Sequence, residues 1–296
     1  MRYSLKIFIN NIRYLARYNL KEIDSKIQSF PNLSNFADLL PNEIKNDFDK
    51  IQPPIVKTSF ETLQILLETQ KSFIRFGDGE YILMNGGSIG FQKYDANLAR
   101  ALETIITSED ENLLIGLGYN YFRMPPDNAR SPWFKYTWVM KNYPIIKKYL
   151  IPNKEYGATE LSQIYAGYKD YDFKAHYAGL KKLFADKKIL LVCGDKVLAN
   201  VQYNLFEEAQ EIATIYGATK HAYESIGVLK EEILKFPKDW VLVFALGPAG
   251  KVLGYEMFKL GYRVLDIGHS IKDYDAYKRK LRMDREEISK FFAPDE

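Results

Sequence analysis

The chain has 296 residues, 47% of them hydrophobic and 27% charged, which is the composition of an ordinary globular protein long enough for one large α/β domain or two smaller ones. Its formal net charge of +3 excludes the global basic field expected of a nucleic-acid-binding protein. Cys193 is the only cysteine, which excludes a disulfide framework and a cysteine-ligated zinc site and fits a reducing cytosol. With three histidines in all, any metal is expected to have oxygen ligands.

The N-terminal segment, MRYSLKIFINNIRYLARYNLKEI, carries charges throughout and has no signal-peptide pattern, and no run of about 18 apolar residues predicts a membrane span. Wound as a helix, it places an apolar stripe beside a basic face that includes Arg13 and Arg17. Such a helix fits peripheral contact with the inner face of the cell membrane, and it equally fits packing on the protein itself or on a partner subunit. We expect a cytoplasmic protein, with membrane contact and a homo-oligomer both left open.

Residues 30–57 hold four of the twelve prolines and read as a connecting segment, so we expect an N-terminal extension over 1–56 and one main domain over 57–296. In the first half, the hydrophobic pattern predicts helices over 58–71, 95–107 and 133–150, the last broken near Pro144, and strands over 72–76 and 112–118. In the second half it predicts strands over 187–195, 211–218, 239–247 and 262–268, helices over 198–210, 219–235 and 249–260, and a charged helix after Asp273. This alternation predicts an α/β fold with a Rossmann-like, doubly wound, mostly parallel sheet and an N-terminal helical extension.

Glycines and acids gather where the predicted strands end. The five strand ends are Gly77–Glu80, Gly116–Gly118, Cys193–Asp195, Leu246–Pro248 and Asp266–His269. Ligands of open parallel sheets bind beyond the carboxyl ends of the strands, so we expect the functional site at this edge. The segment 118–134, rich in tyrosine and proline, is long enough to form a substrate-binding loop or lid.

Asp78 and Glu80 form the pair that favours a metal site. If the backbone stays extended after Phe76, residues two apart point to the same side, and the two carboxylates can share one Mg²⁺ or Mn²⁺. A surface turn built from ordinary turn residues explains the spacing equally well. Arg75 fits a phosphate contact or an ion pair with a nearby acid.

Two further stretches carry candidate chemistry. Gly247 and Pro248 lie in the turn before the predicted helix that starts at Ala249, and the free N–H groups of its first turn, together with Lys251 there, would attract a phosphate. Glycines needed for close helix packing give the same pattern. This stretch matches neither a Walker loop nor the dinucleotide fingerprint. At the last strand end, Asp266 or His269 could serve as the base that deprotonates an acceptor hydroxyl, or the histidine could be structural.

Taken together, FIRFGDGE, SIGFQKYD and ALGPAGKVLGYEMFKLGYRVLDIGH resemble bacterial glycosyltransferases of the GT-D fold, over about residues 57–277. The resemblance implies that Asp78 and Glu80 coordinate a divalent cation, typically Mn²⁺, which holds the diphosphate of a UDP-sugar. It also implies a glycan or glycoprotein acceptor, as in surface polysaccharide or adhesin glycosylation.

We therefore expect a metal-dependent hexosyltransferase that uses a nucleotide sugar. Two alternatives remain from the residues alone. One is a Rossmann-type phosphohydrolase or oxidoreductase, against which the missing dinucleotide fingerprint counts. The other is a non-catalytic glycan-assembly subunit, against which the polar strand ends count.

Overall fold

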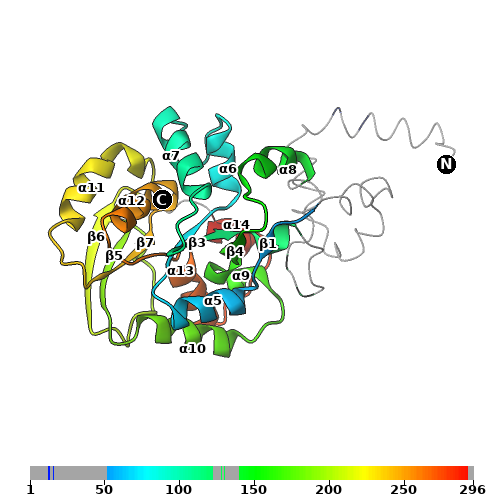
Figure 1. Ribbon diagram of the computed structural model, residues 1–296. Helices are drawn as coiled ribbons and strands as arrows, with labels where there is room; N and C mark the ends of the chain where they lie inside the picture. The colour runs from blue at the N-terminus through cyan, green and yellow to red at the C-terminus, as the bar shows by residue number, and fades with distance from the viewer. Residues whose placement is uncertain are drawn as a thin grey trace.

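The computed structural model describes residues 52–122, 128, 130 and 140–292, together with residues 13 and 16 (Figure 1). Arg13 and Ala16 are helical and exposed, and the rest of the predicted N-terminal helix lies outside the described residues. Most of the predicted 118–134 loop lies outside them as well. None of the helices within the described ranges is both long and apolar enough to cross a membrane.

The described residues contain one eight-stranded sheet with the strand order β1-β4-β3-β2-β8-β7-β5-β6, in which every pairing is parallel. The strands are β1 (Ile55–Val56), β2 (Ser72–Arg75), β3 (Leu113–Leu117), β4 (Glu155–Ala158), β5 (Lys188–Gly194), β6 (Glu211–Gly217), β7 (Val241–Ala245) and β8 (Val264–Asp266). All six predicted strands are present, and the Rossmann-like parallel sheet is confirmed. The sheet also includes residues 55 and 56, which precede the predicted start of the main domain.

Helices cover both faces of the sheet. The α-helices are α5 (Ser59–Glu68), α6 (Asp78–Met84), α7 (Ala96–Ile106), α8 (Met140–Ile146), α9 (Ile164–Gly167), α10 (Phe173–Phe184), α11 (Ile226–Ile233), α12 (Gly247–Lys259), α13 (Ser270–Lys278) and α14 (Arg285–Phe292). Helices α5, α10 and α13 pack on one face, and α7, α11 and α12 pack on the other (Figure 1). The molecule is therefore a doubly wound three-layer α/β structure.

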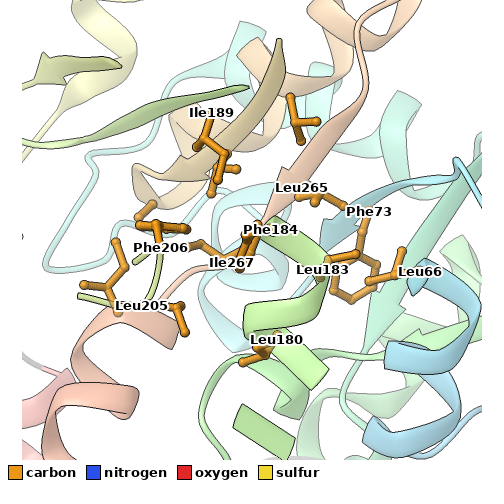
Figure 2. Packing of buried hydrophobic residues seen from close by; sticks show 14 of the residues in the cluster. Leu66, Phe73, Leu180, Leu183, Phe184, Ile189, Leu205, Phe206, Leu265 and Ile267 are labelled. Atoms are coloured by element: carbon orange, nitrogen blue, oxygen red, sulfur yellow. The ribbon is translucent and has the colours of Figure 1, made fainter. Parts of the chain in front are cut away.

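Alternation along β2 sends successive side chains to opposite layers. Phe73 belongs to the same buried cluster as Leu66 of α5 and Leu180 and Phe184 of α10, and Figure 2 shows its ring beside Leu66 and Leu183. The next residue, Ile74, belongs to the core on the other face, under α7. Because both faces are covered, this strand is buried throughout and fixes the position of the segment that follows it.

Three local predictions are wrong. Residues 198–210 form turns rather than a helix, because the Asp275 carboxylate accepts the N–H groups of Gln202 and Tyr203 and holds the segment in another shape. Pro144 lies inside α8, which continues to Ile146 and then into a 3-10 turn. The charged tail is two helices, of which α13 begins before Asp273 and α14 follows it.

Candidate active site

A cavity of about 630 Å³ lies at the carboxyl edge of the sheet, where the strand ends meet. The ends of seven strands contribute residues to its wall: Asp78 after β2, Tyr121 after β3, Glu160 after β4, Gly194 at the end of β5, Thr219 after β6, Lys251 after β7 and His269 after β8. The parallel register produces this convergence, since all carboxyl ends of a parallel sheet lie along one edge.

The segment after β2 turns directly into helix α6. Gly77 is the N-cap, and Asp78 and Glu80 lie in the first turn, so the predicted extended backbone is wrong. In a helix, side chains two apart point roughly 200° away from each other rather than to the same side. Both carboxylates nevertheless line the cavity, because the N-terminal end of α6 opens into it. Glu80 is held there by the Gly77 N–H, which donates to its Oε2 at 2.8 Å.

Asp78 is a carboxylate of the cavity wall whose negative charge is not balanced by an ion pair in the described ranges. It is half-buried, and no lysine or arginine of the described ranges forms an ion pair with it. Burial, followed by the neighbouring Glu80 charge, raises the pKa of Asp78 above its ordinary value. A cation that binds beside such a carboxylate would stabilise its charged form.

Four buried charges form a chain beside Asp78. The Lys251 Nζ lies 3.2 Å from Glu80 Oε1 and 3.2 Å from Asp266 Oδ2, and Arg75 Nη2 lies 3.1 Å from Asp266 Oδ1. Each of the four side chains is at most 9% exposed. Such a chain persists in a core only when its partners neutralise one another, and here two cations meet two carboxylates.

Arg75 does not face the cavity as a free phosphate ligand. Its Nε donates to the Asp266 carbonyl at 3.0 Å, and its Nη1 donates to Ser162 Oγ at 2.6 Å. The guanidinium packs against Gly268, where a Cβ would lie 1.7 Å from Nη2 and where φ is +45°. The glycine of the Asp-Ile-Gly-His string is thus required by the arginine of the Phe-Ile-Arg-Phe string.

Asp266 has the geometry of an organiser rather than of a base. Its Oδ1 accepts from Arg75 and from the Gly268 N–H, and its Oδ2 accepts from the Arg75 N–H and pairs with Lys251. Burial alone would raise its pKa, but the Arg75 and Lys251 cations hold the pKa of Asp266 below its ordinary value. A carboxylate whose oxygens are all engaged is a poor proton acceptor, which argues against the predicted base role.

His269 lines the cavity at the N-cap of α13, and its ring lies 5.4 Å from that of Phe291 in α14. Burial, followed by the nearby cations Arg75, Lys272 and Lys251, lowers the pKa of His269 to about 3. The imidazole is therefore neutral at physiological pH.

The start of α12 is only partly as predicted. Gly247 and Pro248 line the cavity, with Gly247 at φ +55°, whereas Ala249 is 1% exposed and belongs to the core. The helix begins at Gly247, so Lys251 lies in its second turn, pointing back toward the Gly247 carbonyl at 3.4 Å. The predicted phosphate-binding residues are therefore split between the cavity wall and the core.

Several residues of the wall were not predicted. Glu160 is buried and accepts the N–H groups of Tyr119 and Asn120, and the Tyr121 ring folds over Gly118 to bring its hydroxyl beside the Asp78 backbone. These contacts join elements far apart in sequence, and the short strand β4 that carries Glu160 to the site has no periodic pattern.

A second unpredicted part of the wall is the segment Ile89–Phe91. His221 holds this segment in place. Its backbone N–H donates to the Phe91 carbonyl at 2.8 Å, and its ring Nδ1 accepts from the Lys93 backbone N–H at 3.1 Å. His221 is left-handed at φ +60°. Part of the string SIGFQKYD therefore lines the cavity.

The donor set fits a hard divalent cation. The candidate ligands are the carboxylates of Asp78 and Glu80, which line the cavity close together in the sequence, whereas both oxygens of Glu160 accept backbone N–H groups. Across the described ranges, no group of three His, Cys, Asp or Glu side chains is placed to hold a metal ion. Mg²⁺ and Mn²⁺ suit such a site, because they commonly take one or two carboxylates and fill the other positions with water and phosphate oxygens.

Comparisons with known proteins agree with this geometry. Residues 73–293 match the family described as glycosyltransferase GT-D fold. Glycosyltransferase GlyD of Streptococcus pneumoniae serotype 4 is 32% identical over 244 residues, which cover 78% of this chain, and the probable glycosyl transferase Gly of Streptococcus gordonii is 32% identical over 222 residues, which cover 74%. The matched parts are 29% and 32% of those relatives, so this chain spans about a third of their length.

Solved structures extend the likeness to the fold. A structure described as a new glycosyltransferase from Streptococcus sanguinis has a TM-score of 0.72 at 28% identity, covering 77% of this chain and 86% of its own. Another, of the highly conserved domain of unknown function 1792 with a distinct glycosyltransferase fold, has a TM-score of 0.73 at 27% identity, covering 80% and 86%. These matches favour the glycosyltransferase prediction over the oxidoreductase and phosphohydrolase alternatives. The chain belongs to the glycosyltransferase GT-D fold family.

Proposed function

We propose that this enzyme transfers a hexose from a nucleotide sugar, UDP-linked by the family resemblance, to a glycan or glycoprotein acceptor, and that Asp78 and Glu80 hold a divalent cation for the donor diphosphate. The observation that supports the proposal is the position of Asp78 and Glu80, which lie in the first turn of α6 and line the cavity. Asp78 has no cationic partner among the described residues. A cation bound there would neutralise the charge that develops on the leaving diphosphate.

The chain's own groups supply the rest of the chemistry. The first turns of α6 and α12 direct backbone N–H groups toward the cavity, and Lys251 adds a positive charge between them. Transfer breaks the bond between the anomeric carbon and the diphosphate oxygen, forms a bond from that carbon to the acceptor oxygen, and releases the acceptor proton. Of the two predicted bases we assign His269 to receive that proton, because it lines the cavity whereas both carboxylate oxygens of Asp266 are engaged, and we reassign Asp266 to positioning Arg75 and Lys251.

The proposal is tested by nucleotide release from a panel of sugar nucleotides, with Mn²⁺ or with EDTA. We expect release from a UDP-hexose with Mn²⁺ and none with EDTA. Asp78→Asn should lower the rate by roughly 100-fold, which is the scale of losing one charge-stabilising contact.

Asp186→Asn is the matched control, because Asp186 is exposed, lies outside the cavity wall and has φ +56°, a conformation that asparagine accepts. It should keep the wild-type rate. Release that is equally fast in EDTA, or unchanged in Asp78→Asn, would show that the proposed cation site is not used.

A further inference from the structure

Lys251 occupies an unusual place for a residue expected to bind phosphate. It is 5% exposed, and its ammonium lies between two carboxylates, 3.2 Å from Glu80 Oε1 and 3.2 Å from Asp266 Oδ2. Within the described residues, the ammonium has one further hydrogen bond, a weak one of 3.4 Å to the Gly247 carbonyl. The lysine is therefore committed to the carboxylates and not yet to a ligand.

The two candidate cation ligands are unequal because of this contact. Glu80 has both oxygens engaged, Oε2 by the Gly77 N–H at 2.8 Å and Oε1 by Lys251. Asp78 has no such ion pair in the described part of the chain. A cation can approach Asp78 at once, but it reaches Glu80 Oε1 only when the ammonium leaves.

Electrostatics then separates two binding events. A divalent cation that enters alone meets the positive charge of Lys251 a few ångströms away, in a buried site where screening is weak. A cation that enters with a diphosphate brings its own counter-charge, and the diphosphate gives the ammonium a new partner. Asp266 keeps its contacts to Arg75 when Lys251 moves, so the rest of the network need not rearrange.

We propose that Lys251 is a positioning residue that occupies Glu80 until a nucleotide diphosphate arrives, and then passes its ammonium to the diphosphate and frees Glu80 for the cation. Cation and nucleotide consequently bind interdependently, each weakly without the other. The inference rests on the proposed function, because it assumes a cation at Asp78 and Glu80. The flexible four-carbon stem of lysine allows the short movement that the exchange requires.

The test is a titration of the full chain with Mn²⁺, with and without UDP. The EPR signal of free Mn²⁺ measures how much of the ion is bound. Wild-type protein should bind Mn²⁺ weakly alone and much more tightly with UDP. Lys251→Met removes the competing charge, so it should bind Mn²⁺ alone about tenfold more tightly than the wild type, and it should bind UDP more weakly. A purely structural role for Lys251 would weaken both ligands, so the opposite changes are diagnostic.

Lys251→Arg keeps the charge and should behave like the wild type toward Mn²⁺ alone. If thermal melting shows that Lys251→Met does not fold, Lys251→Gln replaces it, since its amide can still donate to Glu80. Mn²⁺ affinity that is unchanged or lower in the neutral variant overturns the inference while leaving the proposed function intact. If the wild-type protein binds no Mn²⁺ even with UDP, and Asp78→Asn gives the same result, both the inference about Lys251 and the proposed cation site are overturned.

Discussion

At the scale of single residues, Gly268 determines whether the charged network can form. The Arg75 guanidinium fills the space beside this glycine and is itself held by Asp266 and Ser162, so it cannot retreat cheaply from a new methyl group. A left-handed φ of +45° adds strain for any other residue. The last strand end is thus built around an arginine that comes from nearly two hundred residues earlier.

Gly268→Ala should therefore lower the free energy of unfolding by about 2 kcal/mol or more, as measured by urea denaturation. Gly227→Ala is the control, because Gly227 lies exposed in α11 with no atom within 4 Å of an added Cβ. That change should be neutral or stabilising by up to about 1 kcal/mol. Equal effects of the two substitutions would contradict the packing described for Arg75.

A second residue-scale effect concerns pH. His176 is 4% exposed, and its Nε2 donates to the Leu161 carbonyl at 3.0 Å. Burial lowers the pKa of His176 to about 4, whereas an unfolded histidine has a pKa of about 6.5. Between these values the unfolded chain binds the proton and the folded chain does not, so the free energy of unfolding falls as the pH is lowered from about 6.5 toward 4.

Urea unfolding at pH 7 and pH 5 measures this loss. His176→Gln keeps a donor for Leu161 but cannot be protonated, so its stability should fall less over the same interval. Asp273, whose pKa burial raises to about 6, acts in the opposite direction in both proteins and cancels from the comparison. An identical fall in the two proteins would mean that His176 does not contribute.

Residue types could be assigned to the site from the sequence, but their pairing could not. Asp78, Glu80, Lys251 and His269 were recognised because they follow predicted strands, and all four line the cavity. That Lys251 neutralises Glu80 depends on how α6 and α12 sit beside each other, which no local pattern encodes. Arg130, a further lining residue, lies in the segment 118–134 that is predicted to form a substrate-binding loop, but no pattern singles out the arginine itself.

At the scale of elements, periodicity predicted the buried strands well because each is a short run of apolar, largely β-branched residues covered on both faces. It failed where polar tertiary contacts replace helical hydrogen bonds, as in 198–210 with Asp275. It also failed at Asp78–Met84, where a glycine-rich string that reads as a turn is capped into a helix by Glu80.

Helix α14 closes one end of the cavity. Ile288 lines the wall and Phe291 packs beside His269, while both rest on a small cluster that includes Ala276 and Met283. Since burial is the main cause of the low pKa of His269, removing the phenyl ring should admit water and raise that pKa from about 3 part of the way toward its ordinary value.

Phe291→Ala is the variant that checks this, with histidine titration followed by NMR, which is tractable because the chain has three histidines. Lys290→Ala on the exposed side of the same helix is the control and should leave the pKa of His269 in place. An unchanged titration in Phe291→Ala would assign the low pKa to the neighbouring cations instead.

At the scale of the whole molecule, one architectural fact brings the site together. Every strand pairing is parallel, so loops from seven strands meet at one edge although the residues they carry span 77 to 272 in the sequence. That edge was predictable from the alternation of strands and helices alone. The N-terminal amphipathic helix lies outside the described residues except for Arg13 and Ala16, and its contact with an anionic membrane surface stays a prediction.

The central claim is that Asp78 and Glu80 hold the cation that binds the donor diphosphate. Its most direct test is anomalous scattering at the manganese absorption edge from crystals grown with Mn²⁺ and UDP. We predict a single strong peak in contact with both carboxylates, with the UDP diphosphate on its other side and the Lys251 ammonium turned from Glu80 toward the phosphate. Bound UDP with no manganese peak at these carboxylates would contradict the account.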